Sequence, residues 1–175
     1  HNPSATDENP GTALNRRTLL QTAFASSMAY ALATQPIAAQ TAIETPTTGL
    51  QAGMVEIDVN GFALPAYRAM PQGKSQKAGG WPVVLVISEI FGVHAHIADV
   101  CRRLAHQGYM ALAPALFVRQ GDAASYTDIP KLMSEVIAQV PDAQVMADLD
   151  ATVQWASKNG GNTKRLGITG FCWGG

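Results

Sequence analysis

The fold of this 175-residue chain is indicated most directly by the stretch Leu-Gly-Ile-Thr-Gly-Phe-Cys-Trp-Gly-Gly at positions 166–175. Its largely apolar start predicts a buried strand. A strand that turns at once into a helix strains the backbone of the residue at the bend, and side chains two positions before or after it would collide with the turn. Gly170 and Gly174 remove those side chains. We therefore expect Cys172 at the tip of a strand-turn-helix bend.

This pattern is typical of a nucleophile elbow in which cysteine replaces serine. The sulfur of Cys172 would lie near the first amides of the following helix, where a thiolate and later an oxyanion are favoured. The alternative is an inert core cysteine, because free cysteines among apolar residues are often buried packing groups. The order of strand, bend and small-residue helix start favours the nucleophile.

Both ends of the chain have the character of fragment boundaries, since it begins with His1 and ends on Gly175, where a helix should start. A nucleophile needs a base and an acid that orients the base. With this elbow, both partners follow the nucleophile in the chain. We therefore expect them, and the later strands of the sheet, beyond residue 175, and we expect the fragment to be inactive by itself.

The first 39 residues resemble a twin-arginine signal peptide. Arg16 and Arg17 precede an alanine-rich apolar stretch at 18–33, and small residues at 36–39 suit a signal peptidase. The alternative is an amphipathic surface helix with a chance arginine pair. The signal predicts the twin-arginine export machinery as a partner, a periplasmic or secreted location, and no membrane association after its removal.

Composition is that of an ordinary globular chain, with 47% hydrophobic residues, 14% charged residues and a net charge of -1. This balance gives no indication of nucleic-acid binding. Residues 40–53 are expected to form a mobile linker, and residues 54–175 the N-terminal portion of an α/β domain.

Within that domain, Asn60-Gly61 predicts a tight hairpin between two alternating strands. Beyond it, apolar strands alternate with helical patterns, which favours a three-layer sandwich around a mostly parallel sheet with an antiparallel N-terminal hairpin. The expected strands are 54–59, 62–70, 83–87, 110–113 and 165–169, and the expected helices are about 97–107, 129–140 and 142–159.

Other residues that could carry chemistry have simpler interpretations. Cys101 lies at helical spacing among apolar residues and is expected to fill the core rather than to form a disulfide. His94 and His96 near Asp99 could be metal ligands, but no further cysteine or histidine completes a set, so loop or helix-start histidines are favoured. We expect no metal and no cofactor.

Three separated segments together resemble the dienelactone hydrolase family, also called carboxymethylenebutenolidases. They are Glu-Ile-Phe-Gly-Val at 89–93, the stretch 107–120, and the cysteine elbow at 170–175. The resemblance runs from about Met54 to the end, and the glutamate segment paired with a cysteine elbow is its most selective part.

The resemblance implies a role for each matching residue. Cys172 would be the nucleophile that forms an acyl-enzyme, and Glu89 would hold the resting thiol and help to generate the thiolate. The backbone N-H groups of Ile90 and Trp173 would form the oxyanion hole. Arg119 would bind a substrate carboxylate. From position alone, Glu89 could instead be a surface carboxylate or a helix cap, and Arg119 an ordinary solvated arginine.

The function expected from these residues is hydrolysis of a small ester or lactone, with or without a carboxylate group. A non-catalytic periplasmic binding module related to the α/β-hydrolases is the alternative. An acid and a histidine after the elbow would separate the enzyme from the binding module.

Overall fold

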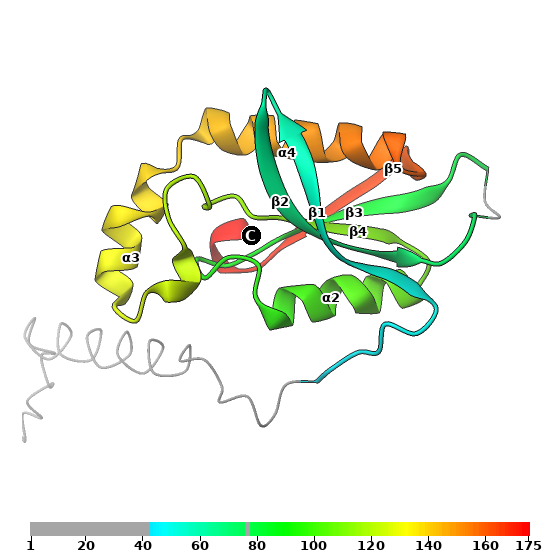
Figure 1. The fold of residues 1–175 in the computed structure, drawn as a ribbon, viewed down its shortest axis with the longest axis horizontal. Helices are drawn as coiled ribbons and strands as arrows, with labels where there is room; N and C mark the ends of the chain where they lie inside the picture. The colour runs from blue at the N-terminus through cyan, green and yellow to red at the C-terminus, as the bar shows by residue number, and fades with distance from the viewer. Residues whose placement is uncertain (1–42, 76–77) are drawn as a thin grey trace, which may run out of the picture. The chain divides into compact units, whose positions relative to one another are not determined.

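A five-stranded sheet with the order β1-β2-β4-β3-β5 forms the centre of the described residues, which are 43–75 and 78–175 in this computed structural model (Figure 1). The predicted signal peptide lies outside the described residues. The strands are β1 (Leu50–Val59), β2 (Phe62–Pro71), β3 (Trp81–Ile87), β4 (Met110–Pro114) and β5 (Gly161–Gly170), and the helices are α2 (Ala95–His106), α3 (Ile129–Glu135) and α4 (Asp142–Lys158).

The sheet is mixed, as the sequence predicted. β1 pairs with β2 and β2 with β4 in antiparallel fashion, whereas β3 lies parallel to both β4 and β5. The first hairpin closes through Asn60 and Gly61, whose φ angles of 53° and 88° are those of a two-residue turn that follows the strand twist. The predicted hairpin is therefore confirmed.

Side chains along β3 alternate between the two faces of the sheet, and both faces are covered by helices. Val83, Leu85 and Ile87 point into a core shared with α3 and α4, while Val86 points into a second core under α2. Figure 1 shows the corresponding layers, with α2 on one side of the sheet and α3 and α4 on the other. Each buried side chain of this size contributes about 1.5–3 kcal/mol through the apolar area that it removes from water.

Two of the element boundaries that differ from the predicted ones change the interpretation of a segment. β1 begins at Leu50, so residues 50–53 belong to a strand and not to a mobile linker. The predicted helix 129–140 ends at Glu135 and gives way to a short 3-10 turn, Ile137–Gln139. The β-branched pair Val136 and Ile137, followed by Pro141, disfavours a continuous helix there.

The strand that leads into the elbow is exposed rather than buried. β5 lies at the edge of the described sheet and pairs with β3. Leu166 is 46% exposed and Ile168 is 63% exposed. The prediction of a buried strand at 166–169 is therefore wrong for the described residues, because the position of β5 in the sheet, and not its composition, decides how much of it is covered.

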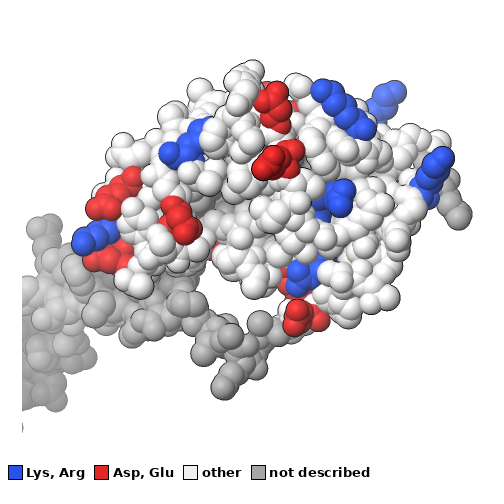
Figure 2. Space-filling model, viewed as in Figure 1, with Lys and Arg blue, Asp and Glu red and all other residues white. Residues whose placement is uncertain are grey.

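On the face seen in Figure 2, acidic and basic side chains are interspersed among uncharged ones, with no broad field of one sign. No helix in the described part of the chain has the length and apolar character needed to cross a membrane.

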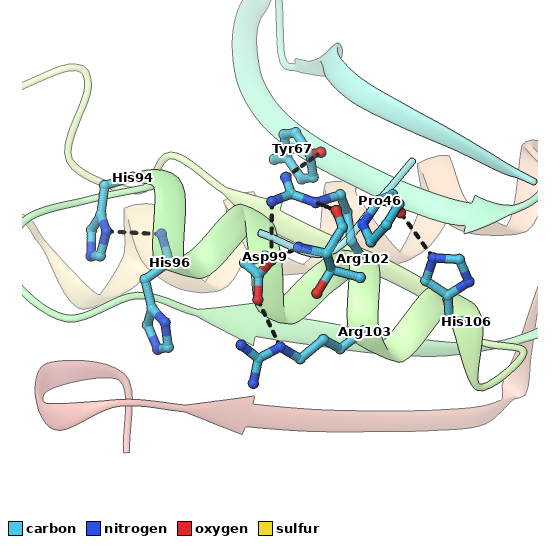
Figure 3. Close-up of polar contacts among 9 residues, drawn as sticks. Pro46, Tyr67, His94, His96, Asp99, Arg102, Arg103 and His106 are labelled. Carbon is cyan, nitrogen blue, oxygen red and sulfur yellow. Dashed lines mark hydrogen bonds and ion pairs between the residues drawn. The ribbon is translucent and has the colours of Figure 1, made fainter. Parts of the chain in front are cut away.

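The segment before β1 is fastened to α2 by a buried carboxylate (Figure 3). Asp99 is 2% exposed and accepts hydrogen bonds from the Thr45 amide at 2.6 Å, from Arg102 Nη2 at 3.1 Å and from Arg103 Nε at 2.7 Å. Arg102 also donates to the Thr45 carbonyl and the Tyr67 hydroxyl. These bonds place Thr45 in the packed structure.

Burial raises the pKa of Asp99, but the hydrogen bonds from Thr45 and Arg103 and the charge of Arg103 outweigh it, so this pKa lies below its ordinary value. A carboxyl group with a lowered folded-state pKa stabilises the fold above its unfolded-state pKa, about 3.9. That stabilisation is lost as the pH falls through the folded-state pKa.

We expect Asp99→Asn to lower the free energy of unfolding by about 2 kcal/mol at pH 7, because it leaves two arginines and a buried site without their carboxylate. Urea unfolding measures the loss. The difference from the unsubstituted protein should shrink below pH 4. Asp150→Asn, on the exposed side of α4, is the matched control and should change the stability by less than about 0.5 kcal/mol. Equal effects of the two substitutions would contradict this account.

Candidate active site

The elbow and the acidic loop meet at the carboxyl ends of two neighbouring parallel strands. The register pairs Ile87, the last residue of β3, with Gly170, the last residue of β5. The Phe171 amide donates to the Ile87 carbonyl at 3.1 Å. Glu89 follows Ile87 by two residues, so Cys172 and Glu89 start from the same edge of the sheet, where open α/β sheets bind their ligands.

The backbone at Cys172 has the strain that the sequence predicted. Its φ angle is 54°, in a region that residues with side chains rarely adopt. A Cβ on Gly170 would overlap the Gly174 carbonyl, and a Cβ on Gly174 would lie 2.6–2.8 Å from Ile87. The Cys172 thiol is free and exposed. The bend therefore holds the sulfur outward, and the two glycines make the bend possible.

Aromatic contacts hold both neighbours of Cys172. The Phe171 ring meets the edge of His96 with centroids 5.7 Å apart, and the Trp173 ring meets Phe117 at 4.8 Å. Phe117 is buried in the core that α3 and α4 cover. The elbow is thus braced from α2 on one side and from the loop after β4 on the other. Sequence reasoning missed these contacts, since they join segments distant in the chain.

The two backbone amides predicted for the oxyanion hole belong to the residues that directly follow Cys172 and Glu89 in the sequence. Trp173 lies in the 3-10 turn Cys172–Gly174 directly after the sulfur, and Ile90 follows Glu89. Within the described residues, the backbone hydrogen bonds recorded in these two loops are donated by Gly92, His94, Phe171, Gly174 and Gly175. The role of these two N-H groups in an oxyanion hole stays a prediction.

The carboxylate of Glu89 is half enclosed and bonded on one side only. Its Oε1 atom pairs with Nε2 of His94, and its Oε2 atom is buried without a hydrogen-bond partner. Oε2 therefore does not hold the Cys172 thiol in this structure. Burial raises the pKa of Glu89, but the hydrogen bond from His94, a backbone hydrogen bond and the nearby His96 outweigh it, so the pKa lies below its ordinary value.

His94 begins α2, which confirms the interpretation of this histidine as a helix-start residue. Its Nδ1 atom accepts a hydrogen bond from the His96 amide at 3.3 Å. The described residues contain no group of three or more histidine, cysteine or acidic side chains that could hold a metal ion. The contact between His94 and Glu89 was not predicted, although a histidine five residues after an acid was a visible signal.

Arg119 has a partner inside the chain. Its Nη1 and Nη2 atoms donate to the two oxygens of Asp148 at 2.7 and 2.8 Å, and its guanidinium lies 3.9 Å from the centre of the Phe62 ring. Asp148 is fully buried. The arrangement fits a planar bidentate donor, but the acceptor is a residue of α4. Arg119 is therefore not an ordinary solvated arginine, and its role with a substrate carboxylate stays a prediction.

Cys101 lies in the core between α2 and the sheet. It is fully buried, and burial raises the pKa of its thiol to about 12. A thiol in this environment is unreactive. The structure thus confirms the predicted difference between a core cysteine and an exposed one.

Two hollows lie outside the elbow itself. An apolar pocket of about 210 Å³ lies between the loop after β3 and the loop after β4. Its lining residues include Phe91, Val93, Phe117 and Val118. A cavity of about 380 Å³ lies between the first hairpin and α4. The apolar pocket is the one next to the elbow, since Phe117 lines it and contacts Trp173.

A parallel sheet edge, a strained cysteine after β5 and an acidic loop after β3 define an α/β-hydrolase type of site. The profile of the Dienelactone hydrolase family matches residues 64–175. The chain belongs to this family.

Two curated relatives and one crystal structure show how far the similarity extends. A Methylorubrum extorquens protein described as "Putative carboxymethylenebutenolidase" is 56% identical over 165 residues, which are 94% of this chain and 55% of that protein. An Escherichia coli K12 protein with the same description is 52% identical over 146 residues, 83% of this chain and 52% of that one. The crystal structure of a "Putative Dienelactone Hydrolase" from Klebsiella pneumoniae has a TM-score of 0.67 at 53% identity and covers 71% of this chain and 51% of that one. The chain therefore spans about half the length of these relatives.

We expect Gly170→Ala to prevent formation of the elbow, because its new methyl group would overlap the Gly174 carbonyl. Overpacking of this kind costs about 1–3 kcal/mol, and the displaced sulfur should react differently with iodoacetamide. Gly167→Ala, in the same strand, is the matched control, since a Cβ there meets nothing within 4 Å. Alkylation of Cys172 followed by mass spectrometry compares the two. An unchanged alkylation rate in Gly170→Ala would contradict the predicted elbow geometry.

Proposed function

We propose that the complete protein hydrolyses small esters or lactones with Cys172 as the nucleophile. The observation that carries this proposal is the strained, exposed cysteine at the carboxyl ends of β3 and β5. Membership in the dienelactone hydrolase family supports the same class of reaction. The buried, unreactive Cys101 supports the choice between the two thiols.

The reaction has two halves. In the first, the Cys172 thiol loses its proton to a base, its sulfur bonds to the substrate carbonyl carbon, and the C-O bond of the ester breaks as the leaving alcohol takes up a proton. In the second, water attacks the thioester, the C-S bond breaks, and the acid product and the thiol are released. A lactone follows the same steps, except that its alcohol stays attached to the acyl group.

Two groups assist these steps in our proposal. Glu89 accepts the thiol proton, because its Oε2 atom is buried, acceptor-only and free of other donors. The N-H groups of Ile90 and Trp173 stabilise the negative oxygen of the tetrahedral intermediate. Removing one such donor typically costs a factor of about 10² to 10³ in kcat.

Substrates with a carboxylate group would be recognised by Arg119. The guanidinium is held by Asp148 and Phe62, and in this proposal the N-H groups that do not bond to Asp148 donate to the substrate carboxylate. A charge fixed in advance loses little side-chain entropy on binding. This part of the proposal is independent of the nucleophile.

We expect the complete protein to hydrolyse p-nitrophenyl acetate and Cys172→Ala to abolish this turnover, because no other exposed thiol is present among the described residues. The measurement is the release of p-nitrophenol, with mass spectrometry to detect an acyl group on the enzyme. Cys101→Ala is the matched control and should keep the activity. Turnover that survives in Cys172→Ala would overturn the nucleophile assignment.

A test of the role of Arg119 requires a substitution that does not leave the buried Asp148 carboxylate without a partner. Arg119→Ala by itself should destabilise the fold by about 3–5 kcal/mol, because the Asp148 carboxylate would lose its partner. We expect Arg119→Ala combined with Asp148→Ala to recover much of this stability. In that double variant, KM should rise at least tenfold for a carboxylate-bearing ester and stay nearly constant for a neutral ester of the same size. Equal changes for the two esters would reject the proposed role.

A further inference from the structure

His94 uses its two ring nitrogens for two different parts of the site. Nδ1 accepts a hydrogen bond from the His96 amide at the start of α2, and Nε2 bonds to Oε1 of Glu89. A neutral imidazole has one donor and one acceptor nitrogen. Because Nδ1 is the acceptor, Nε2 carries the hydrogen and donates it to the carboxylate. The start of the helix thus sets the orientation of the ring, and the ring sets the orientation of Glu89.

We propose that His94 is a positioning residue for the reaction, which holds Glu89 by one oxygen so that the other oxygen can take the proton of the Cys172 thiol. The inference rests on the proposed function and adds to it a residue that the family resemblance did not assign. His94 acts through Glu89 and needs no contact with the substrate.

The unequal surroundings of the two carboxylate oxygens support this role. Oε1 is occupied by His94, while Oε2 is buried and lacks a partner. A buried acceptor without a donor is unfavourable, so Oε2 is ready to accept a hydrogen bond. Cys172 starts from the same edge of the sheet, and its thiol is the proton donor that we assign to Oε2.

The same histidine pair connects the carboxylate to the elbow. The rings of His94 and His96 stack with centroids 6.2 Å apart, and His96 in turn contacts Phe171, the residue before Cys172. Figure 3 shows the two rings side by side at the start of α2. The acid, the start of the helix and the elbow therefore form one connected set of contacts.

Within the described residues, His94 and His96 are titratable side chains that act on Glu89. The hydrogen bond from His94 is the largest influence that lowers the pKa of Glu89 and opposes the effect of burial. If that hydrogen bond is removed, burial becomes dominant and the pKa of Glu89 should rise. The acidic limb of the pH profile should then move to higher pH.

Two substitutions separate the two functions of the ring. In His94→Asn, the short amide can still accept the His96 N-H and begin the helix, but it cannot reach Glu89. In His94→Gln, the longer amide can donate to Glu89 in place of Nε2. His106→Asn is the matched control, since this histidine lies at the other end of α2 and bonds to the Pro46 carbonyl.

The experiment measures kcat, KM and the pH profile of p-nitrophenyl acetate hydrolysis by the complete protein, with thermal unfolding as a check of the fold. We expect His94→Asn to keep its unfolding midpoint and its KM, to lose between about tenfold and hundredfold in kcat, and to show an acidic limb at higher pH. His94→Gln should recover most of kcat, and His106→Asn should match the unsubstituted protein. An unchanged kcat and pH profile in His94→Asn would overturn the proposal.

Iodoacetamide alkylation of Cys172 tests the inference even if no ester is turned over. A carboxylate near a thiol disfavours the thiolate, so releasing Glu89 should make Cys172 of His94→Asn react with iodoacetamide faster at a given pH than in the unsubstituted protein. Identical alkylation profiles would overturn the positioning role. Absence of Cys172-dependent turnover in the unsubstituted protein, together with shifted alkylation profiles, would overturn the proposed function and leave the contact between His94 and Glu89 supported.

Discussion

The site depends on one steric constraint, the close contact between the bend after β5 and the end of β3. Gly174 lies against Ile87, Gly170 lies against Gly174, and no side chain fits between them. This contact fixes the left-handed backbone at Cys172 and, through Phe171, ties the elbow to the strand from which Glu89 emerges. Backbone strain of this kind persists only where the surroundings over-determine it, and here two parallel strands and two aromatic contacts do so.

The acidic loop has a second source of order in α2. His94, the residue that caps α2, also donates to Glu89. The orientation of the carboxylate therefore depends on a helix that Asp99 and its arginines fasten to the segment before β1. The position of α2 and the orientation of the Glu89 carboxylate are thus linked through the imidazole of His94. This coupling is more rigid than a carboxylate placed on an independent loop, because the position of the ring is set by backbone packing.

Features that depend on neighbouring residues were predictable from the sequence, and features that depend on the path of the chain were not. Asn60-Gly61 and the glycines around Cys172 require particular backbone angles, so their conformations were evident from the sequence. The pairing of Arg119 with Asp148 joins residues 29 positions apart, and only the docking of α4 brings them together. The exposure of Leu166 and Ile168 follows from strand order, which composition does not encode.

The uncovered edge of β5 determines how the described sheet can be extended. One side of this strand presents backbone amides and carbonyls next to the exposed side chains of Leu166 and Ile168. Such an edge strand is a template with which another extended segment can pair through main-chain hydrogen bonds. Pairing of that kind would satisfy these backbone groups and extend the sheet past β5.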